Sequence, residues 1–309
     1  MYKYIFGPVS SRRFGLSLGI DLSPERKSCN FDCLYCELKP AKVVDHIVNP
    51  PKVEDVLDEV KQALLEYPDV DVITITANGE PTLYPSLDTL VDGLNRIKAD
   101  KKVLILSNAS TIIAPAVQDI LKKIDIVKLS LDCATPKCFK KIDRPLKSVD
   151  IEDIIKGLIA FRKKFEHDLI LEILVVEGIN DKEEEMKALK EVLDEVKPDR
   201  VDLGTIDRPP AYDVKGVSTE KLKYLSHYLG NHNISIMHKE KPQKRVDFSK
   251  EEILATLLRR PQSESDVAYL FSEKAKQNLE QLLHEKGVIK KNIAGVQFYA
   301  LPENDKKRG

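Results

Sequence analysis

Short runs of β-branched and aliphatic residues alternate with amphipathic stretches between about residues 16 and 236. This alternation is typical of βαβ units and predicts a mainly parallel sheet covered by helices. Six runs have the length and composition of buried strands: Leu16–Asp21, Val70–Thr76, Lys102–Ser107, Ile124–Leu131, Leu169–Val176 and Val201–Thr205.

The stretches between these strands repeat apolar residues at helical spacing, most clearly in residues 53–64, 151–159 and 186–196. Six strand–helix pairs are too few for a complete eight-stranded barrel. The expected fold class is therefore α/β, as a partial (β/α)6 barrel or a doubly wound sheet. In both arrangements the reactive groups lie at the C-terminal ends of the strands.

A charged, proline-containing stretch at residues 239–248, KEKPQKRVDF, predicts a linker between a first domain (1–238) and a second (249–309). The second domain has three helical patterns, at residues 251–260, 265–271 and 273–286, and then a hairpin pattern at 288–301 that turns at Ala294-Gly295. Three helices and a hairpin predict a winged helix-turn-helix domain.

The charges balance almost completely, with 49 Lys+Arg against 50 Asp+Glu and a net charge of -1. Binding of a nucleic acid would therefore require a local basic patch on the surface. No apolar run approaches the roughly 20 residues that cross a bilayer, and the start MYKYIFGPVSSRRFG lacks the pattern of a signal peptide. We expect a cytoplasmic protein that does not enter a membrane.

Five cysteines are present, and three of them form the pattern Cys29-x3-Cys33-x2-Cys36 directly after the first predicted strand. Disulfides are rare in the cytosol, so this density indicates a metal or redox site. Three thiolates at this spacing can wrap one corner of a cubane cluster and leave its fourth iron without a protein ligand. Structural zinc would need a fourth ligand, for which His46 is a candidate.

The three cysteines, with the aromatic Tyr35 just before the last of them, resemble the signature of the radical S-adenosylmethionine (SAM) superfamily. The resemblance implies a 4Fe-4S cluster on Cys29, Cys33 and Cys36, with SAM bound at the open iron. It also implies that an external electron donor such as ferredoxin or flavodoxin drives cleavage of SAM to a 5'-deoxyadenosyl radical. The cofactor then supplies the difficult chemistry, and the protein binds and orients.

The resemblance also assigns SAM contacts to the strand ends. Asn78-Gly79-Glu80 is similar to a Gly-Gly-Glu motif that contacts the methionine amino group, where glycine permits close backbone approach and a carboxylate suits an ammonium. Further cofactor-binding candidates are Tyr35, Asn108, Ser130, Asp132, Asn180 and Thr205. Ordinary turns and helix caps are the alternative interpretation of these residues.

A narrower likeness covers roughly residues 5 to 215. The segments GPVSSRRFGLSLGIDLSP, CNFDCLYCELKP and GEPTL look like the radical SAM group related to wyosine-type tRNA modification enzymes. The better-studied branch of that group carries a second cluster on additional N-terminal cysteines, but no cysteine precedes Cys29 here. One cluster is therefore expected, and Cys133 and Cys138 are interpreted as buried thiols, with a redox role left open.

Arginines precede the first strand or follow later ones, at Arg12, Arg13, Arg144 and Arg208. Guanidinium groups match phosphate and carboxylate, so these residues suggest an anionic substrate such as a nucleotide or RNA. Salt bridges with carboxylates of the rim are the alternative. Lys290, Lys291 and Asn292 on the predicted wing suggest nucleic-acid contact, although a protein-binding or structural role competes with it.

Three functions follow. The leading hypothesis is a radical SAM enzyme that modifies a tRNA or other RNA base. The second is a radical SAM enzyme acting on a peptide, protein or small metabolite. The third is a DNA-binding regulator whose cluster senses redox state.

Overall fold

The computed structural model describes residues 2–11, 13–208, 210–236, 245–259, 261–293 and 296–302. The chain forms two compact units. One comprises residues 1–20, 58–73 and 239–309, and the other residues 21–57 and 74–238. The predicted boundaries at 238 and 249 stay a prediction, and most of the predicted linker lies outside the described residues.

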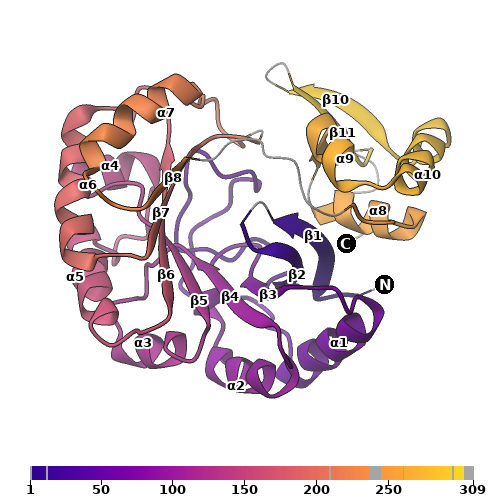
Figure 1. Ribbon diagram of the computed structural model, residues 1–309, viewed down its shortest axis with the longest axis horizontal. Helices are drawn as coiled ribbons and strands as arrows, with labels where there is room; N and C mark the ends of the chain where they lie inside the picture. The colour runs from indigo at the N-terminus through magenta and orange to yellow at the C-terminus, as the bar shows by residue number, and fades with distance from the viewer. Residues whose placement is uncertain are drawn as a thin grey trace. The chain divides into compact units, whose positions relative to one another are not determined.

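Within the described residues the main sheet has eight strands, and their spatial order follows the chain from β1 to β8 (Figure 1). Neighbours from β4 to β8 pair in parallel, whereas β1 and β2 are antiparallel. The strands are β1 Ile5–Ser11, β2 Gly15–Asp21, β3 Val72–Thr76, β4 Lys102–Ser107, β5 Ile126–Ser130, β6 Asp168–Val175, β7 Arg200–Thr205 and β8 Ile234–Ile236.

All six predicted strands are confirmed, with ends that differ by at most two residues. β1 was not predicted, because it contains Gly7-Pro8, and proline and glycine weaken the pattern of a strand. β8 was not predicted either, because it has only three residues.

Helices line the outer side of the curved strands, as Figure 1 shows for α2, α3, α5 and α6. They are α1 Val53–Glu66, α2 Leu87–Ile97, α3 Pro115–Leu121, α4 Pro136–Ile142, α5 Ile151–Arg162, α6 Glu183–Val196 and α7 Thr219–Ser226. The apolar stripe expected in residues 186–196 is fully on the buried face of α6. Sequential strand order with helices on one side favours the open, partial barrel over the doubly wound sheet, whose strand order reverses.

The C-terminal residues form three helices and a small antiparallel sheet of order β10-β11-β9. The elements are α8 Lys250–Arg259, β9 Gln262–Ser263, α9 Glu264–Leu270, α10 Glu273–His284, β10 Ile289–Ile293 and β11 Val296–Ala300. Phe248, Leu257, Phe271 and Leu279 pack in their common core, and Ser263 caps α9 through a capping box with Asp266. The predicted helices and hairpin are confirmed, while the turn at residues 294–295 lies outside the described residues; that these elements form a winged helix stays a prediction.

No helix in the described part of the chain is long and apolar enough to span a bilayer.

Candidate functional site

The three cysteines of the motif lie on a loop that follows β2, here called the cluster loop (residues 28–37). All three are free, half-buried thiols. The backbone N–H of Cys36 donates to the carbonyl of Cys33 at 3.1 Å, which folds the motif back on itself. The loop therefore presents three sulfurs from one short segment.

The cluster loop is fastened to the end of β3 at Gly79. Ser28 donates its N–H to the carbonyl of Asn78 at 2.9 Å, and Glu80 donates its N–H to the carbonyl of Ser28 at 3.0 Å. A Cβ on Gly79 would lie 1.8 Å from the Ser28 carbonyl oxygen, and the φ of Gly79 is +145°. Only glycine fits here, because both the close approach and the backbone angle exclude a side chain.

The Glu80 carboxylate is buried and joins the ends of β3 and β4. Its Oε1 accepts hydrogen bonds from Thr82 N–H at 2.9 Å, the Thr82 hydroxyl at 2.7 Å and the Ser107 hydroxyl at 2.7 Å. Its Oε2 accepts from Asn108 N–H at 2.7 Å. Burial raises the pKa of Glu80, and these donors oppose the shift. Because Oε2 accepts one bond and Oε1 three, Oε2 keeps capacity for a further donor.

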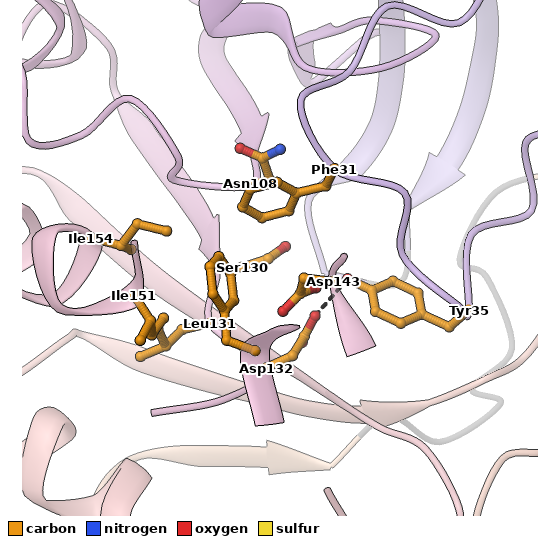
Figure 2. A pocket seen from close by; sticks show the side chains of 10 residues that line it. Phe31, Tyr35, Asn108, Ser130, Leu131, Asp132, Asp143, Ile151 and Ile154 are labelled. Atoms are coloured by element: carbon orange, nitrogen blue, oxygen red, sulfur yellow. Dashed lines mark hydrogen bonds between the residues drawn. The ribbon is translucent and has the colours of Figure 1, made fainter. Parts of the chain in front are cut away.

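Beside Glu80, the Asn108 side chain faces the cluster loop. Its Nδ2 lies 3.7 Å from the sulfur of Cys29 and donates to Asn30 Oδ1 at 3.0 Å. Asn108, Ser130 and Asp132 line one pocket together with Tyr35 and Phe31, as Figure 2 shows. The structure thus brings together predicted residues from β4, β5 and the cluster loop.

Two buried carboxyl groups, Asp132 and Asp143, border the same pocket. Asp132 accepts hydrogen bonds from the Tyr35 phenol at 2.5 Å and from Leu174 N–H at 2.7 Å. Burial raises the pKa of Asp132 to about 7 and the pKa of Asp143 well above its ordinary value. The sulfur of Cys33 lies 3.4 Å from Asp143 Oδ1.

The same burial raises the pKa of Cys29 to about 12 and that of Cys33 well above its ordinary value. Thiols in such a place ionise when a strong positive charge is next to them, as a bound metal provides. Among the described residues the sulfurs of Cys29, Cys33 and Cys36 do not all lie within 4.8 Å of one another. Tetrahedral zinc, with Zn–S bonds of about 2.3 Å, would draw its sulfurs to roughly 3.8 Å. The three sulfurs therefore do not stand at the spacing of a closed zinc site.

His46, the candidate fourth zinc ligand, has a side chain that is 66% exposed. Its Nδ1 lies 2.8 Å from the carboxylate of its neighbour Asp45. Its side-chain contact is therefore with its neighbour and not with the cysteines, and the three-thiol donor set stays a prediction.

Lys27 is a cationic residue of the site that the sequence patterns did not predict. The ammonium of Lys27 lies 3.5 Å from the sulfur of Cys36 and 3.8 Å from Asp32 Oδ1, and the lysine side chain is only 7% exposed. Asp32 Oδ1 is buried and makes no hydrogen bond in the described part of the chain. A charged residue two positions before the first cysteine was the available signal.

Two of the rim arginines form ion pairs with the cluster loop. Arg144 lies 3.4 Å from Asp32 Oδ2 and stacks over the ring of Tyr212. Arg208 lies 2.7 Å from Glu37. These contacts agree with the salt-bridge alternative, and a substrate role for the two arginines stays a prediction.

The segment after β7 is also fixed to the cluster loop. Ala211 donates its N–H to the carbonyl of Cys36 at 2.8 Å, and Tyr212 donates its hydroxyl to Asp32 at 2.5 Å.

Of the remaining arginines, Arg12 lies outside the described residues, and Arg13 is half-buried in the other unit.

The side chains of Asn180 and Thr205 form hydrogen bonds with backbone groups. Asn180 is fully buried, accepts from Val176 N–H and donates to the carbonyls of Asp132 and Leu174. Thr205 donates to the carbonyl of Val175 and accepts from Val217 N–H. Both therefore hold the loops around the site in place, and their expected contact with the cofactor stays a prediction.

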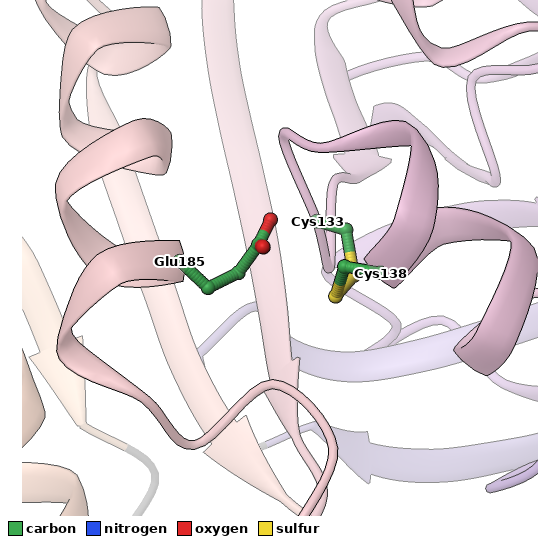
Figure 3. A group of neighbouring side chains, drawn as sticks. All are labelled: Cys133, Cys138 and Glu185. Atoms are coloured by element: carbon green, nitrogen blue, oxygen red, sulfur yellow. A yellow bond between two sulfur atoms is a disulfide. The ribbon is translucent and has the colours of Figure 1, made fainter.

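Cys133 and Cys138 differ from the expectation of two separate thiols. They are buried as expected, but they form a disulfide across the first turn of α4, with their Cα atoms 5.7 Å apart (Figure 3). Glu185 of α6 lies beside them, yet its carboxylate accepts hydrogen bonds from Ala134 N–H and from the N–H and hydroxyl of Thr135. The segment after β5 brings Cys133 beside Cys138 in the first turn of α4, a contact that their spacing alone did not reveal.

Comparison with known proteins agrees with this geometry. The family model described as the radical SAM superfamily matches residues 27–189. A protein of Helicobacter pylori named UPF0026 protein is 40% identical over 299 residues, which are 96% of each chain.

Two solved structures share the fold at low identity. One is a structure of TYW1 with a lysine-pyruvate adduct, with a TM-score of 0.54 and 18% identity over 70% of this chain and 74% of that chain. The other is SuiB of Streptococcus suis bound to its precursor peptide SuiA, with a TM-score of 0.57 and 20% identity over 73% of this chain and 49% of that chain.

Proposed function

The chain belongs to the radical SAM superfamily, and on that basis we propose that it cleaves SAM at a 4Fe-4S cluster on Cys29, Cys33 and Cys36 to modify a base of tRNA or another RNA. Members of the superfamily bind a 4Fe-4S cluster and SAM. When bound and reduced, these cofactors supply a carbon radical that abstracts hydrogen from a substrate.

The observation that carries the proposal is the convergence of three free thiols with polar strand ends at one pocket. Cys29 contacts Asn108, and Cys33 contacts Asp143 beside Asp132. Three sulfurs from one loop leave one iron of a cubane cluster without a protein ligand. A cluster held by Cys29, Cys33 and Cys36 would thus supply an open position for SAM.

The strand ends have distinct roles in this proposal. Gly79 and Asn78 bring backbone close to the cluster loop, and Glu80 Oε2 has capacity for the methionine ammonium. Asn108, Ser130 and Asp132 line the small pocket beside these groups, and we assign the further polar contacts of SAM to them. Tyr35 fixes the carboxylate of Asp132, while Asn180 and Thr205 hold the loops that carry these groups.

Protein groups also shield the site from water. Phe31 and Phe139 pack edge to face at 5.4 Å on the wall of the pocket. Lys27 covers the sulfur of Cys36 with a buried ammonium. Exclusion of water protects a reactive intermediate from side reactions.

An RNA substrate is supported by the sequence segments similar to wyosine-type enzymes and by the C-terminal helices and hairpin, which we propose to be a winged helix. Lys291 and Lys290 lie on β10 of that hairpin, although Lys290 is paired with Glu264 at 3.0 Å. Winged helices bind nucleic acid through their third helix and their hairpin.

Two experiments test the proposal at separate levels. The chemistry is tested by anaerobic reconstitution with iron and sulfide, followed by reduction with SAM present. Formation of 5'-deoxyadenosine and methionine is expected, and their absence would refute the cleavage reaction.

The substrate is tested by mass spectrometry of tRNA nucleosides from a deletion strain and its parent. An unchanged nucleoside profile would favour a peptide, protein or small metabolite instead.

A further inference from the structure

We propose that the exposed face of α4 is the docking surface for an acidic electron-donor protein that reduces the cluster. Five basic residues lie on α4 and the turn after it, and all are exposed: Lys137, Lys140, Lys141, Arg144 and Lys147. The proposal rests on the cluster site proposed above, and it adds the place and the charge of the partner.

The basic residues of α4 form one stripe. Lys137, Lys140 and Lys141 stand at positions i, i+3 and i+4, which share one face of a helix. The opposite face, Cys138, Phe139 and Ile142, is buried. The stripe therefore points outward, away from the pocket.

Local structure explains only part of this charge. Lys140 and Lys141 lie in the last turn of α4, where a positive charge favours the helix dipole. Lys137 lies in the first turn, where the dipole disfavours it, and it repels Lys141 at i+4. Lys137 and Lys140 form no ion pair or hydrogen bond through their side chains with any described residue, and Lys141 reaches only the carbonyl of Gly178, at 3.4 Å. An anionic partner would relieve this repulsion.

The end of α4 touches the cluster loop directly. Leu34 donates its N–H to the carbonyl of Ile142 at 2.9 Å, and Asp32 donates its N–H to the carbonyl of Asp143 at 3.0 Å. The sulfur of Cys33 itself lies 3.4 Å from Asp143 Oδ1. Asp143, which caps the C-terminal end of α4, is therefore in direct contact with Cys33, a proposed ligand of the cluster. Electron transfer falls steeply with distance, so a donor gains from docking here.

Proximity to Cys33 favours an electron-carrier protein over RNA as the partner. A basic stripe would also attract phosphate, but an RNA substrate must reach the pocket inside the strand ends, whereas the lysines face outward. Opposite charge on two proteins steers their encounter and is weakened by salt.

The test compares two reductants on the reconstituted protein. Reduced flavodoxin serves as the protein donor and reduced methyl viologen as a small cation that needs no docking surface, and bleaching of the cluster absorbance is followed by stopped flow. In the variant Lys137→Gln/Lys140→Gln/Lys141→Gln, the rate with flavodoxin should fall about 10-fold or more at low salt. The rate with methyl viologen should not fall, because a small cation gains nothing from a basic surface. High salt should remove the difference with flavodoxin.

The matched control is Lys52→Gln/Lys163→Gln/Lys223→Gln, which removes the same charge from exposed lysines on other elements. It should keep the flavodoxin rate. An unchanged flavodoxin rate in the α4 variant would overturn the proposal, as would an equal loss in the control or with methyl viologen. An unchanged flavodoxin rate with weakened tRNA binding would assign the stripe to RNA. Bleaching by methyl viologen reports the cluster itself, so failure of the docking proposal is distinct from failure of the proposed function.

Discussion

The Tyr35 phenol donates a hydrogen bond to the Asp132 carboxylate, across 97 positions of the chain. Tyr35 stands next to Cys36 on the cluster loop, and Asp132 follows β5. The backbone N–H of Leu174 in β6 donates to the other carboxylate oxygen. One buried carboxylate therefore fixes the cluster loop against two strand ends.

Removal of the phenol should loosen this junction. Tyr35→Phe leaves Asp132 with an unsatisfied oxygen in a buried place, so the free energy of unfolding should fall by about 1–3 kcal/mol. Urea denaturation of the cluster-free protein measures it. Tyr224→Phe, at a tyrosine that is 44% exposed, serves as control and should change stability less. Equal effects of the two variants would contradict a special role for the Tyr35 contact.

The raised pKa of Asp132 predicts a pH dependence of stability in the cluster-free protein. Burial raises the pKa from its ordinary 3.8 to about 7, so the folded state holds the proton more tightly than the unfolded chain does. The contribution of this group is complete below about pH 4 and is lost as the pH rises through 7, at up to about 1.4 kcal/mol per pH unit for one proton.

Urea denaturation at several pH values between 4 and 8 (about the window set by those two pKa values) checks this dependence. Asp132→Asn has no proton to lose there, so its stability should fall less with rising pH than that of the unmodified protein. Parallel curves for the two proteins would contradict the assignment to Asp132.

Substitution of Gly79 should disrupt the junction between β3 and the cluster loop. In Gly79→Ala the new Cβ meets the Ser28 carbonyl at 1.8 Å, so the backbone must separate and iron binding should be lost. Gly178→Ala is the matched control: its φ is +71°, but nothing lies within 4 Å of the added Cβ. The control should lose only about 1–2 kcal/mol from its left-handed backbone. Denaturation midpoints and iron content measure both, and full iron content in Gly79→Ala would refute the requirement for glycine.

Lys27 should set the reduction potential of the cluster. Its buried ammonium is near the sulfur of Cys36, where it would stabilise the extra negative charge of a reduced cluster. In Lys27→Met the midpoint potential should become more negative by about 60 mV, which corresponds to about 1.4 kcal/mol for one electron. A redox titration followed by electron paramagnetic resonance measures it. Lys39→Met, at an exposed lysine near the same loop, should shift the potential less.

The five cysteines should divide into two classes. Alanine at Cys29, Cys33 or Cys36 should reduce the iron content well below the roughly four atoms per chain of a complete cluster. Cys133→Ala/Cys138→Ala should keep the iron, because that pair forms a disulfide between the segment after β5 and α4, outside the cluster loop. Iron analysis with visible absorption measures both classes, and iron loss in the double variant would assign the pair to the cluster.

Local patterns in the sequence determined much of the molecule. Hydrophobic periodicity located six strands, the apolar face of α6 and the C-terminal helices, because burial of an apolar stripe depends on the spacing of residues within one element. The spacing of three cysteines within eight residues located the cluster loop, because this spacing also lies within one short segment. β1 and β8 were missed because proline and short length erase that periodicity.

Only the tertiary structure decided which distant residues meet. Glu80 joins β3 to β4, Lys27 lies against Cys36, and Asp143 reaches Cys33 from the end of α4. It also paired Arg144 and Arg208 with Asp32 and Glu37, and Cys133 with Cys138. These contacts arise from the packing of whole elements. The free energy of a contact between separate elements depends on where the sheet and the helices place both partners. The spacing of residues within one segment does not contain that information.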